Sequence, residues 1–169
     1  PFPPLPPGQE RLPIRDVALL KGHDAVATAK HSDAPIEVQP LGGVTDGQQL
    51  FFRPQNDQGW VEVSFESEKE QTAELTLKVI HSFDYGIYRV LLDGKLVGRF
   101  DLYNPNIVPT GEKLGTQTLS AGKHTLRFEC VGKSPKSAGY YLGFDALTVR
   151  VPAYSRPASV DLRTLQKHD

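Results

Sequence analysis

The stretch YRVLLDGKLVGRFDL, residues 88–102, places two apolar runs on either side of Asp93-Gly94. An Asp-Gly pair between alternating hydrophobic segments is a strong signal for a β-hairpin, because glycine adopts the positive φ of a tight turn. We therefore predict two antiparallel strands joined by a turn at 93–95. In the second strand, Leu96, Phe100 and Leu102 share one phase, with Gly98 between them, and are expected to face the core.

Three further segments alternate in the same way. A period of two over short segments is typical of half-buried antiparallel strands, and no long segment has the period of a helix. A second tight turn is expected at SAGK, 120–123. We therefore predict an all-β fold, an antiparallel β-sandwich of the jelly-roll kind. The residues expected to point inward are Val61, Val63 and Phe65 in VEVSF, Ala73, Leu75, Leu77 and Val79 in AELTLKV, and Leu126, Phe128 and Cys130 in HTLRFECV.

The last strand, YYLGFDALTVRV at 140–151, changes phase. Its apolar residues alternate up to Phe144 and resume in the opposite phase at Leu147, which predicts a β-bulge near Asp145 and Ala146. Trp60 and Tyr88 both lie within predicted strands and are expected to be core residues.

Both ends of the chain differ from the middle in composition. Residues 1–15, PFPPLPPGQERLPIR, hold six prolines and favour extended polyproline geometry, as in a linker or an arm that contacts a partner. The predicted domains are therefore a Pro-rich linker or arm at 1–15, a sandwich at 16–151 and a polar tail at 152–169. The chain has no methionine, so we expect a mature product or a segment of a longer protein.

Composition argues against several classes of partner. The 169 residues carry a net charge of −1, which argues against nucleic acid and anionic membranes. No apolar run reaches the length of a membrane span. A single cysteine, Cys130, excludes an intrachain disulfide and a multi-cysteine zinc site.

The direction of the strands predicts where a binding site lies. If the strand at 72–80 runs toward one end of the sandwich, the loops at 81–86, 103–113 and 132–139 all lie at that end, and the tight turns lie at the other. These loops are rich in aromatic and polar residues. Long loops displayed by a rigid sandwich commonly form binding sites. Their candidate ligand-binding residues are Phe83, Asp84, Tyr85, Tyr103, Asn104, Lys136 and Tyr141.

Such residues suit a sugar. The apolar face of a pyranose stacks on an aromatic ring, while Asn, Asp and Lys side chains bond to its hydroxyls. Alternatives remain for each: Tyr85 and Tyr103 could be packing residues, Asn104 could serve the turn around Pro105, and Lys136 could be solvated. Tyr140 shares its phase with core residues, so Tyr141 is expected to be the exposed one of the pair.

The order QGWVEVSFE, YRVLLDGKLVGRFDL, TLSAGKHTLRFECVG and GFDALTV resembles the galactose-binding-like jelly rolls, above all carbohydrate-binding module families 6 and 35. The resemblance spans roughly residues 17–151. It implies sugar binding through loop aromatics and an Asn, and often a structural calcium held by two glutamates spaced as E-x-E near the first strand. Lys21 and His23 stand at that spacing in ALLKGHDAV. A cation and an imidazole are poor calcium ligands. We therefore predict no cofactor and no metal site. The alternative is a structural calcium elsewhere, with Glu37 or Asp145 as its carboxylate ligands.

The sequence contains no nucleophile elbow, phosphate-binding glycine loop or HExxH zinc motif. We predict a non-catalytic accessory module of an exported bacterial protein, extracellular or periplasmic. Its partners would be a polysaccharide or oligosaccharide and, through the Pro-rich arm, an attached catalytic domain or a neighbouring subunit. The alternative is a structural or assembly subunit that binds protein. A small glycan-active enzyme would need two carboxylates facing across a groove.

Overall fold

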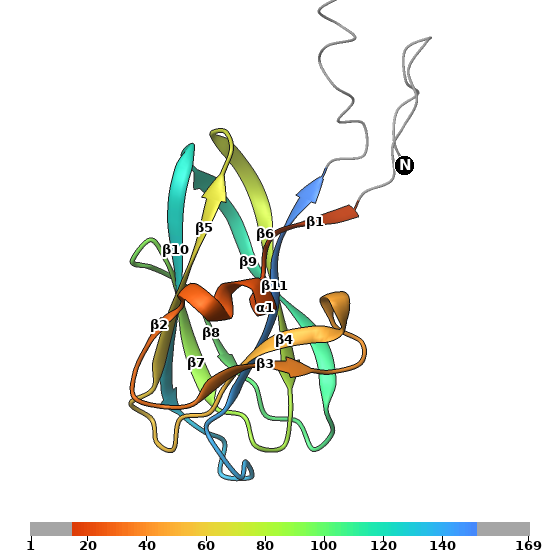
Figure 1. Ribbon diagram of the computed structural model, residues 1–169, viewed down its shortest axis with the longest axis vertical. Coiled ribbons are helices and arrows are strands. Elements are labelled where there is room, and N and C mark those ends of the chain that lie inside the picture. Colours follow the sequence, from red (N-terminus) through yellow and green to blue (C-terminus); the bar gives the residue numbers. More distant parts are fainter. Residues whose placement is uncertain (1–14, 152–169) are drawn as a thin grey trace, which may run out of the picture. The chain divides into compact units, whose positions relative to one another are not determined.

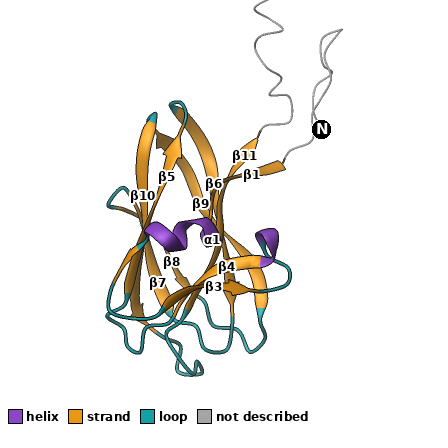
Figure 2. Cartoon of the chain, viewed as in Figure 1, coloured by secondary structure: helices purple, strands orange, loops and turns teal. Residues whose placement is uncertain are grey.

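The computed structural model describes residues 15–151, and the predicted all-β fold is confirmed (Figures 1 and 2). Residues 1–14 and 152–169, which include most of the predicted arm and the whole predicted tail, lie outside the described residues. The elements are β1 (Arg15–Lys21), α1 (Gly22–Ala25), η1 (Val26–Thr28), β2 (Lys30–His31), β3 (Ile36–Pro40), η2 (Thr45–Gly47), β4 (Gln48–Phe52), β5 (Trp60–Ser67), β6 (Gln71–His81), β7 (Ile87–Leu92), β8 (Lys95–Asp101), β9 (Val108–Leu119), β10 (Gly122–Gly132) and β11 (Leu142–Val151).

The strands form two sheets. One has the order β3-β4-β11-β6-β9, with β1 also paired to β11, and the other has the order β2-β5-β10-β7-β8. The described chain divides into two units. Residues 18–149 contain the sandwich, and the second unit includes residues 15–17 and 150–151, where Arg150 Nε lies 3.6 Å from Asp16 Oδ1. Within residues 15–151, no helix is long and apolar enough to cross a bilayer.

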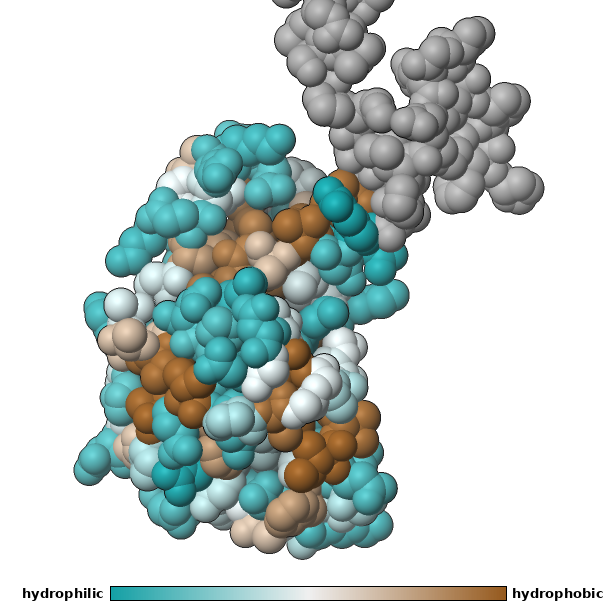
Figure 3. Space-filling view, turned by 45° about the vertical axis from the view of Figure 1, so that its right-hand side comes forward, coloured by the Kyte–Doolittle hydropathy of each residue, from teal (hydrophilic) through white to brown (hydrophobic). Residues whose placement is uncertain are grey.

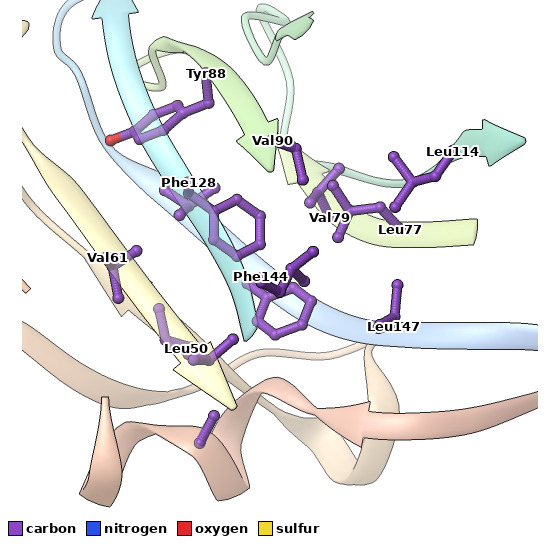
Figure 4. Close-up of a cluster of buried hydrophobic side chains, with 14 of the residues drawn as sticks. Leu50, Val61, Leu77, Val79, Tyr88, Val90, Leu114, Phe128, Phe144 and Leu147 are labelled. Carbon is purple, nitrogen blue, oxygen red and sulfur yellow. The ribbon is translucent and has the colours of Figure 1, made fainter. Parts of the chain in front are cut away.

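The hydrophobic core lies between the two sheets (Figure 4). Phe128 from β10 and Phe144 from β11 meet with their ring centres 5.1 Å apart. The predicted inward phases of β5, β6 and β10 are confirmed, except that Ala73 is only partly buried. Tyr88 is also buried, as predicted.

In the β7–β8 hairpin, the predicted turn is confirmed, but the predicted inward position of Leu96 is wrong. Asp93 (φ 51°) and Gly94 (φ 83°) both have positive φ, as a two-residue type I′ turn requires. Beyond the turn, Leu91 pairs with Leu96 but Val90 pairs with Gly98, so a bulge inserts one residue into β8. The bulge reverses the phase, and Leu96 is 54% exposed rather than in the core.

Trp60 is not a core residue either. It shares the phase of Glu62 at the start of β5, whereas Val61 and Val63 point inward. Its ring is only partly buried and lies on the outer face of the sheet. The predicted bulge in β11 is confirmed, because the pairing with β6 shifts between Phe144 and Ala146.

The ring of His124 connects the two tight turns. Its Nδ1 lies 2.6 Å from Asp93 Oδ2 and its Nε2 lies 2.7 Å from the Ser120 carbonyl oxygen. Burial lowers the pKa of His124, but the bonds to Asp93 and Ser120 outweigh it and raise the pKa above its ordinary value of 6.5. The protonated ring donates to both acceptors, so this contact is strongest in the charged form.

We therefore expect His124 to make stability depend on pH. A group whose pKa is raised by folding stabilises the folded state fully at pH values below its pKa in the unfolded chain. This stabilisation is lost as the pH rises through the pKa of the folded state. His124→Gln should thus reduce the free energy of unfolding more at about pH 5.5 than at about pH 8.5, measured by urea denaturation. Equal losses at both pH values would contradict this role.

Candidate functional site

Three loops meet at one end of the sandwich, at the bottom of Figure 1. Ser82 N donates to the Leu102 carbonyl, which joins the β6–β7 loop to the β8–β9 loop, and Ala138 N donates to the Phe83 carbonyl from the β10–β11 loop. The structure thus brings together the loops that the strand directions predicted. The β8–β9 loop is shorter than predicted, because residues 108–113 pair with β6 as the start of β9.

Ser137 fixes the β10–β11 loop against the β6–β7 loop. Its buried hydroxyl donates to the Tyr85 carbonyl at 2.7 Å, and Lys133 Nζ donates to the Ser137 carbonyl at 3.0 Å. These bonds use backbone acceptors within the loops, so the cluster is preorganised rather than dependent on a ligand.

A hollow of about 180 Å³ opens beside this cluster, between the loops and the outer face of the β3–β4 hairpin. Its lining combines three aromatic rings with amide, hydroxyl and carboxylate groups. The lining residues are Gln39, Leu41, Phe51, Ser82, Phe83, Asp84, Tyr85 and Ile107.

Behind the lining of the hollow, a buried polar group bonds to two of the lining residues, Gln39 and Tyr85. Gln49 is fully buried, and its Nε2 donates to Gln39 Oε1 at 2.7 Å and to Tyr85 Oη at 3.3 Å, while its Oε1 has no partner among the described residues. Burial raises the pKa of Tyr85 to about 12, so its hydroxyl stays protonated. A side chain at Gly143 would come within 2.5 Å of Gln49 Oε1, so glycine there leaves room for the amide.

Aromatic rings support this group from β4 and from the end of the β10–β11 loop. Phe51 stacks on Tyr85 with ring centres 6.2 Å apart, and Tyr141 meets Phe51 edge-on at 5.6 Å. The Arg53 guanidinium lies 5.7 Å from the centre of the Phe51 ring. The rings are therefore held in place from both sides.

Phe83 is the exposed aromatic of the hollow. Its side chain is 47% exposed, although its carbonyl accepts from Ala138. Asp84 follows it, with Oδ1 accepting from Ser82 Oγ at 3.2 Å. Exposing a large ring on a fixed backbone leaves an apolar face ready for a flat ligand.

The structure separates the seven predicted site residues. Phe83, Asp84 and Tyr85 line the hollow. Tyr85 is only 4% exposed, because it stacks on Phe51 and bonds to Gln49, so it is a wall and not an open platform. Tyr141 is half-buried against Phe51 rather than exposed.

The remaining three predicted residues belong to the loop cluster but not to the lining. Tyr103 forms a bridge with Ser82, and Asn104 Oδ1 accepts from Asn106 N in the turn. Lys136 is exposed on the β10–β11 loop. This hydrogen bond agrees with the alternative that Asn104 serves the turn around Pro105.

Sequence reasoning missed the contribution of the β3–β4 hairpin. Phe51, Gln39 and Leu41 enter the hollow from segments that precede the loops by at least 30 residues along the chain. A signal was present: in QQLFF, Leu50 and Phe52 face the core, which places Gln49 and Phe51 on the outer face.

The residues at the position where the resemblance implies a calcium ion do not fit one. Lys21 Nζ lies 2.9 Å and His23 Nε2 lies 3.0 Å from Asp46 Oδ2, so an ammonium group and an imidazole ring occupy the carboxylate that a metal would need. Glu37 pairs with Arg53, and Asp145 accepts from Thr45 N. No group of three or more His, Cys, Asp or Glu side chains within residues 15–151 is arranged to hold a metal.

We accordingly expect calcium to have no effect on stability. A ligand that binds only the folded state raises the midpoint of thermal unfolding, by an amount that grows with the logarithm of its concentration above the dissociation constant. Scanning calorimetry with calcium and with a chelator should give the same midpoint. A midpoint that climbs with the logarithm of the calcium concentration would show that a site exists.

No protein-family model matches the chain, and no curated protein matches it. Solved structures do match, at identities that show the fold alone. A Paenibacillus xanthan lyase aligns with a TM-score of 0.64 and 20% identity over 74% of this chain and 12% of that one.

Two further structures match a larger share of the chain. A GH26-CBM35 β-(1,4)-mannanase from Podospora anserina aligns with a TM-score of 0.55 and 17% identity over 84% of this chain and 28% of that one. A family 35 carbohydrate-binding module from Clostridium thermocellum aligns with a TM-score of 0.50 and 15% identity, over 80% of this chain and 97% of that one. The chain thus shares the β-sandwich fold of a family 35 carbohydrate-binding module, in agreement with the resemblance drawn from the sequence.

Proposed function

We propose that the protein is a non-catalytic carbohydrate-binding module whose site is the hollow beside Phe83. One observation carries the proposal: a half-exposed aromatic ring stands over a preformed hollow whose other walls combine apolar side chains with amide, hydroxyl and carboxylate groups. Concave sites that combine apolar surface with a few placed polar groups are suited to small hydroxylated ligands. The fold shared with the family 35 module supports the same function.

Each wall has a role in this mechanism. A sugar ring stacks its axial C–H groups on Phe83, and Asp84 accepts hydrogen bonds from its hydroxyls. Gln39 Oε1 already accepts from Gln49, which leaves its Nε2 to donate to the ligand. The neutral Tyr85 hydroxyl stays at the inner wall and orders the Gln49 amide. Affinity for a single sugar should be weak, because each bond to the ligand replaces one to water.

Catalysis is not part of this proposal. Glycoside hydrolysis generally requires two carboxylates on opposite sides of the scissile bond. Asp84 is the only carboxylate among the described residues that line the hollow. A lone Asp can recognise a hydroxyl but does not supply both an acid and a base.

The wider setting of the module is also proposed. The same fold occupies small shares of a xanthan lyase and a mannanase, which supports a module attached to a catalytic domain. We propose that the protein is exported, outside the cell or in the periplasm, and concentrates a partner enzyme on its polysaccharide. The Pro-rich segment at 1–15 would connect the two.

One observation favours the alternative of an assembly subunit. Ile107 is 55% exposed, and Val108 and Phe83 are also exposed, so aliphatic surface adjoins the hollow. Figure 3 shows that apolar side chains, in brown, gather in several patches on the face turned toward the viewer. Exposed aliphatic surface of this kind also suits a protein partner.

The experiment that separates these functions is a glycan array on the purified chain, with calcium and with chelator. It should include plant, algal and bacterial polysaccharides, xanthan and β-1,4-mannan among them. We expect retention on at least one polysaccharide, equal in both conditions. Retention on none would overturn the proposed function and favour the assembly subunit.

A further inference from the structure

Gln49 is a buried amide that stands behind the hollow beside Phe83 without lining it. It lies on the outer face of β4, yet it is 0% exposed. The strand ladders on either side of β4 are made by main-chain groups and do not need this side chain. Burying a polar side chain is costly, so an apolar residue would serve the fold at this position equally well.

The two polar atoms of the Gln49 amide are used unequally. Its Nε2 donates to Gln39 Oε1 at 2.7 Å and to Tyr85 Oη at 3.3 Å, which employs both of its N–H groups. Its Oε1 has no partner among residues 15–151. Most buried polar groups are paired, so this arrangement secures the two donations at the expense of the acceptor.

The first donation fixes the orientation of Gln39. The two residues are direct neighbours across the β3–β4 pair, and Gln39 also lines the hollow. A carboxamide has one acceptor oxygen and one donor nitrogen. Because Gln39 Oε1 faces the Gln49 donor, Gln39 Nε2 is the atom left for a ligand. Gln49 thus decides which end of the Gln39 amide the hollow receives.

The space for this network is provided by two other segments. Tyr85, from the β6–β7 loop, accepts from Gln49 with a hydroxyl that burial keeps neutral. On β11, a Cβ at Gly143 would lie 2.5 Å from Gln49 Oε1 and 2.6 Å from Tyr85 Oη. The amide therefore depends on a glycine at this position.

The rest of the lining leaves Gln39 as its side-chain amide donor. Asp84, when ionised, only accepts hydrogen bonds. The Ser82 hydroxyl already donates to Asp84 Oδ1 at 3.2 Å. If the Gln39 amide were reversed, both Gln39 and Asp84 would present acceptors, and a ligand would have to supply a donor to each.

We propose that Gln49 is a positioning residue that sets the hydrogen-bonding polarity of the hollow, by holding Gln39 with its Nε2 toward the ligand. The inference rests on the proposed function, because it concerns how that same site selects a glycan. A site with one fixed donor and one fixed acceptor rejects ligands that leave either group unpaired.

Gln49→Glu keeps the shape of the side chain and makes its bonding depend on pH. The ionised carboxylate only accepts, so Gln39 must turn its Nε2 inward. Burial raises the pKa of a carboxyl group, and the protonated form regains a donor for Gln39 Oε1. We expect this variant to bind the glycan at least about tenfold more weakly than the wild type at about pH 9, and to recover most of this loss at about pH 5.5.

The wild type, measured at the same pH values, controls for the other charged groups near the network. These are Tyr85, Asp84, which acts on Tyr85 through its charge, and Arg53, which lies on the Phe51 ring. A purely structural role of Gln49 would give a loss that does not reverse with pH.

Gly143→Ala tests the same network from β11 and changes no residue that bonds or lines. Its Cβ displaces the Gln49 amide, so we expect a loss of at least about tenfold at both pH values. The matched control is Gly42→Ala, where a Cβ would meet nothing within 4 Å. This control should stay within about twofold of the wild type.

Isothermal titration calorimetry gives the affinities, and circular dichroism checks the fold of each variant. The probes are mannohexaose, xanthan oligosaccharides and an oligosaccharide of the polysaccharide retained best on the array. A further measurement needs no variant: in ¹⁵N-labelled wild type, the side-chain amide resonances of Gln39 should shift on saturation with the glycan.

The outcomes separate this inference from the proposed function. Suppose that the wild type binds and Phe83→Ala removes the binding. Equal affinity of Gln49→Glu and wild type, a loss that does not reverse with pH, or unshifted Gln39 side-chain resonances would then overturn the role of Gln49 and leave the site standing. No binding of any probe by the wild type would overturn both.

Discussion

Phe83→Ala is expected to weaken glycan binding at least about tenfold, a loss of about 1.4 kcal/mol. Phe83 is the exposed ring of the hollow, and its backbone is fixed by Ala138. Truncation therefore removes the stacking surface while the fold is retained. Isothermal titration calorimetry with the best polysaccharide of the array gives the affinity of both proteins.

The matched control is Lys136→Ala. Lys136 is exposed on the neighbouring loop but does not line the hollow. Its removal should leave the affinity within about twofold, because solvated charges contribute little. If Lys136→Ala weakened binding and Phe83→Ala did not, the site would lie on the β10–β11 loop instead.

Leu126→Ala is expected to lower the free energy of unfolding by about 2–5 kcal/mol, whereas Leu96→Ala should change it by less than about 0.5 kcal/mol. Both substitutions remove the same atoms from a strand. Leu126 is 0% exposed in the core, and Leu96 is 54% exposed beyond the bulge in β8. The first leaves a cavity, and the second leaves only solvent.

Urea denaturation followed by circular dichroism measures both values. The pair tests the architecture, since strict alternation along β8 would bury Leu96. Comparable losses from the two substitutions would mean that β8 has no bulge and that Leu96 belongs to the core.

Much of the fold could be predicted because local signals sufficed. Asp93-Gly94 determines its hairpin through the positive φ of both residues. Which residues of β5, β6 and β10 face the core depends only on the alternation of apolar and polar residues. The bulge in β11 was visible because apolar residues stand on both sides of the phase change. In β8, by contrast, the inserted residue falls between Leu96 and Gly98, and nothing in the local pattern marks it.

The site was predicted only in part, because its walls come from distant segments. Strand direction alone predicted that Phe83 and Asp84 lie at the end of the sandwich where the hollow opens. It could not show that Tyr85 turns inward, because its partners Phe51 and Gln49 come from β4, more than 30 residues earlier in the chain. Trp60 lies on the outer face because it shares the phase of Glu62, whereas Val61 and Val63 point into the core.

The lysine and histidine near the first strand have a physical consequence for the fold. Where the resemblance implies a metal between carboxylates, Lys21 and His23 both approach Asp46. The bond and charge of Asp46 raise the pKa of Lys21, so the ammonium remains charged at neutral pH. Because the pair is exposed, we expect it to position η2 rather than to add much stability.

The central claim is that the Phe83 hollow binds sugar, and the most direct test is amide chemical-shift mapping by NMR. The ¹⁵N-labelled chain is titrated with oligosaccharides of the polysaccharide retained on the array. The account predicts that the largest shifts fall on Gln39, Leu41, Ser82, Phe83, Asp84 and Ile107, which line the hollow. Shifts confined to Asn104 and to the β10–β11 loop around Lys136, or no shifts at saturating ligand, would contradict it.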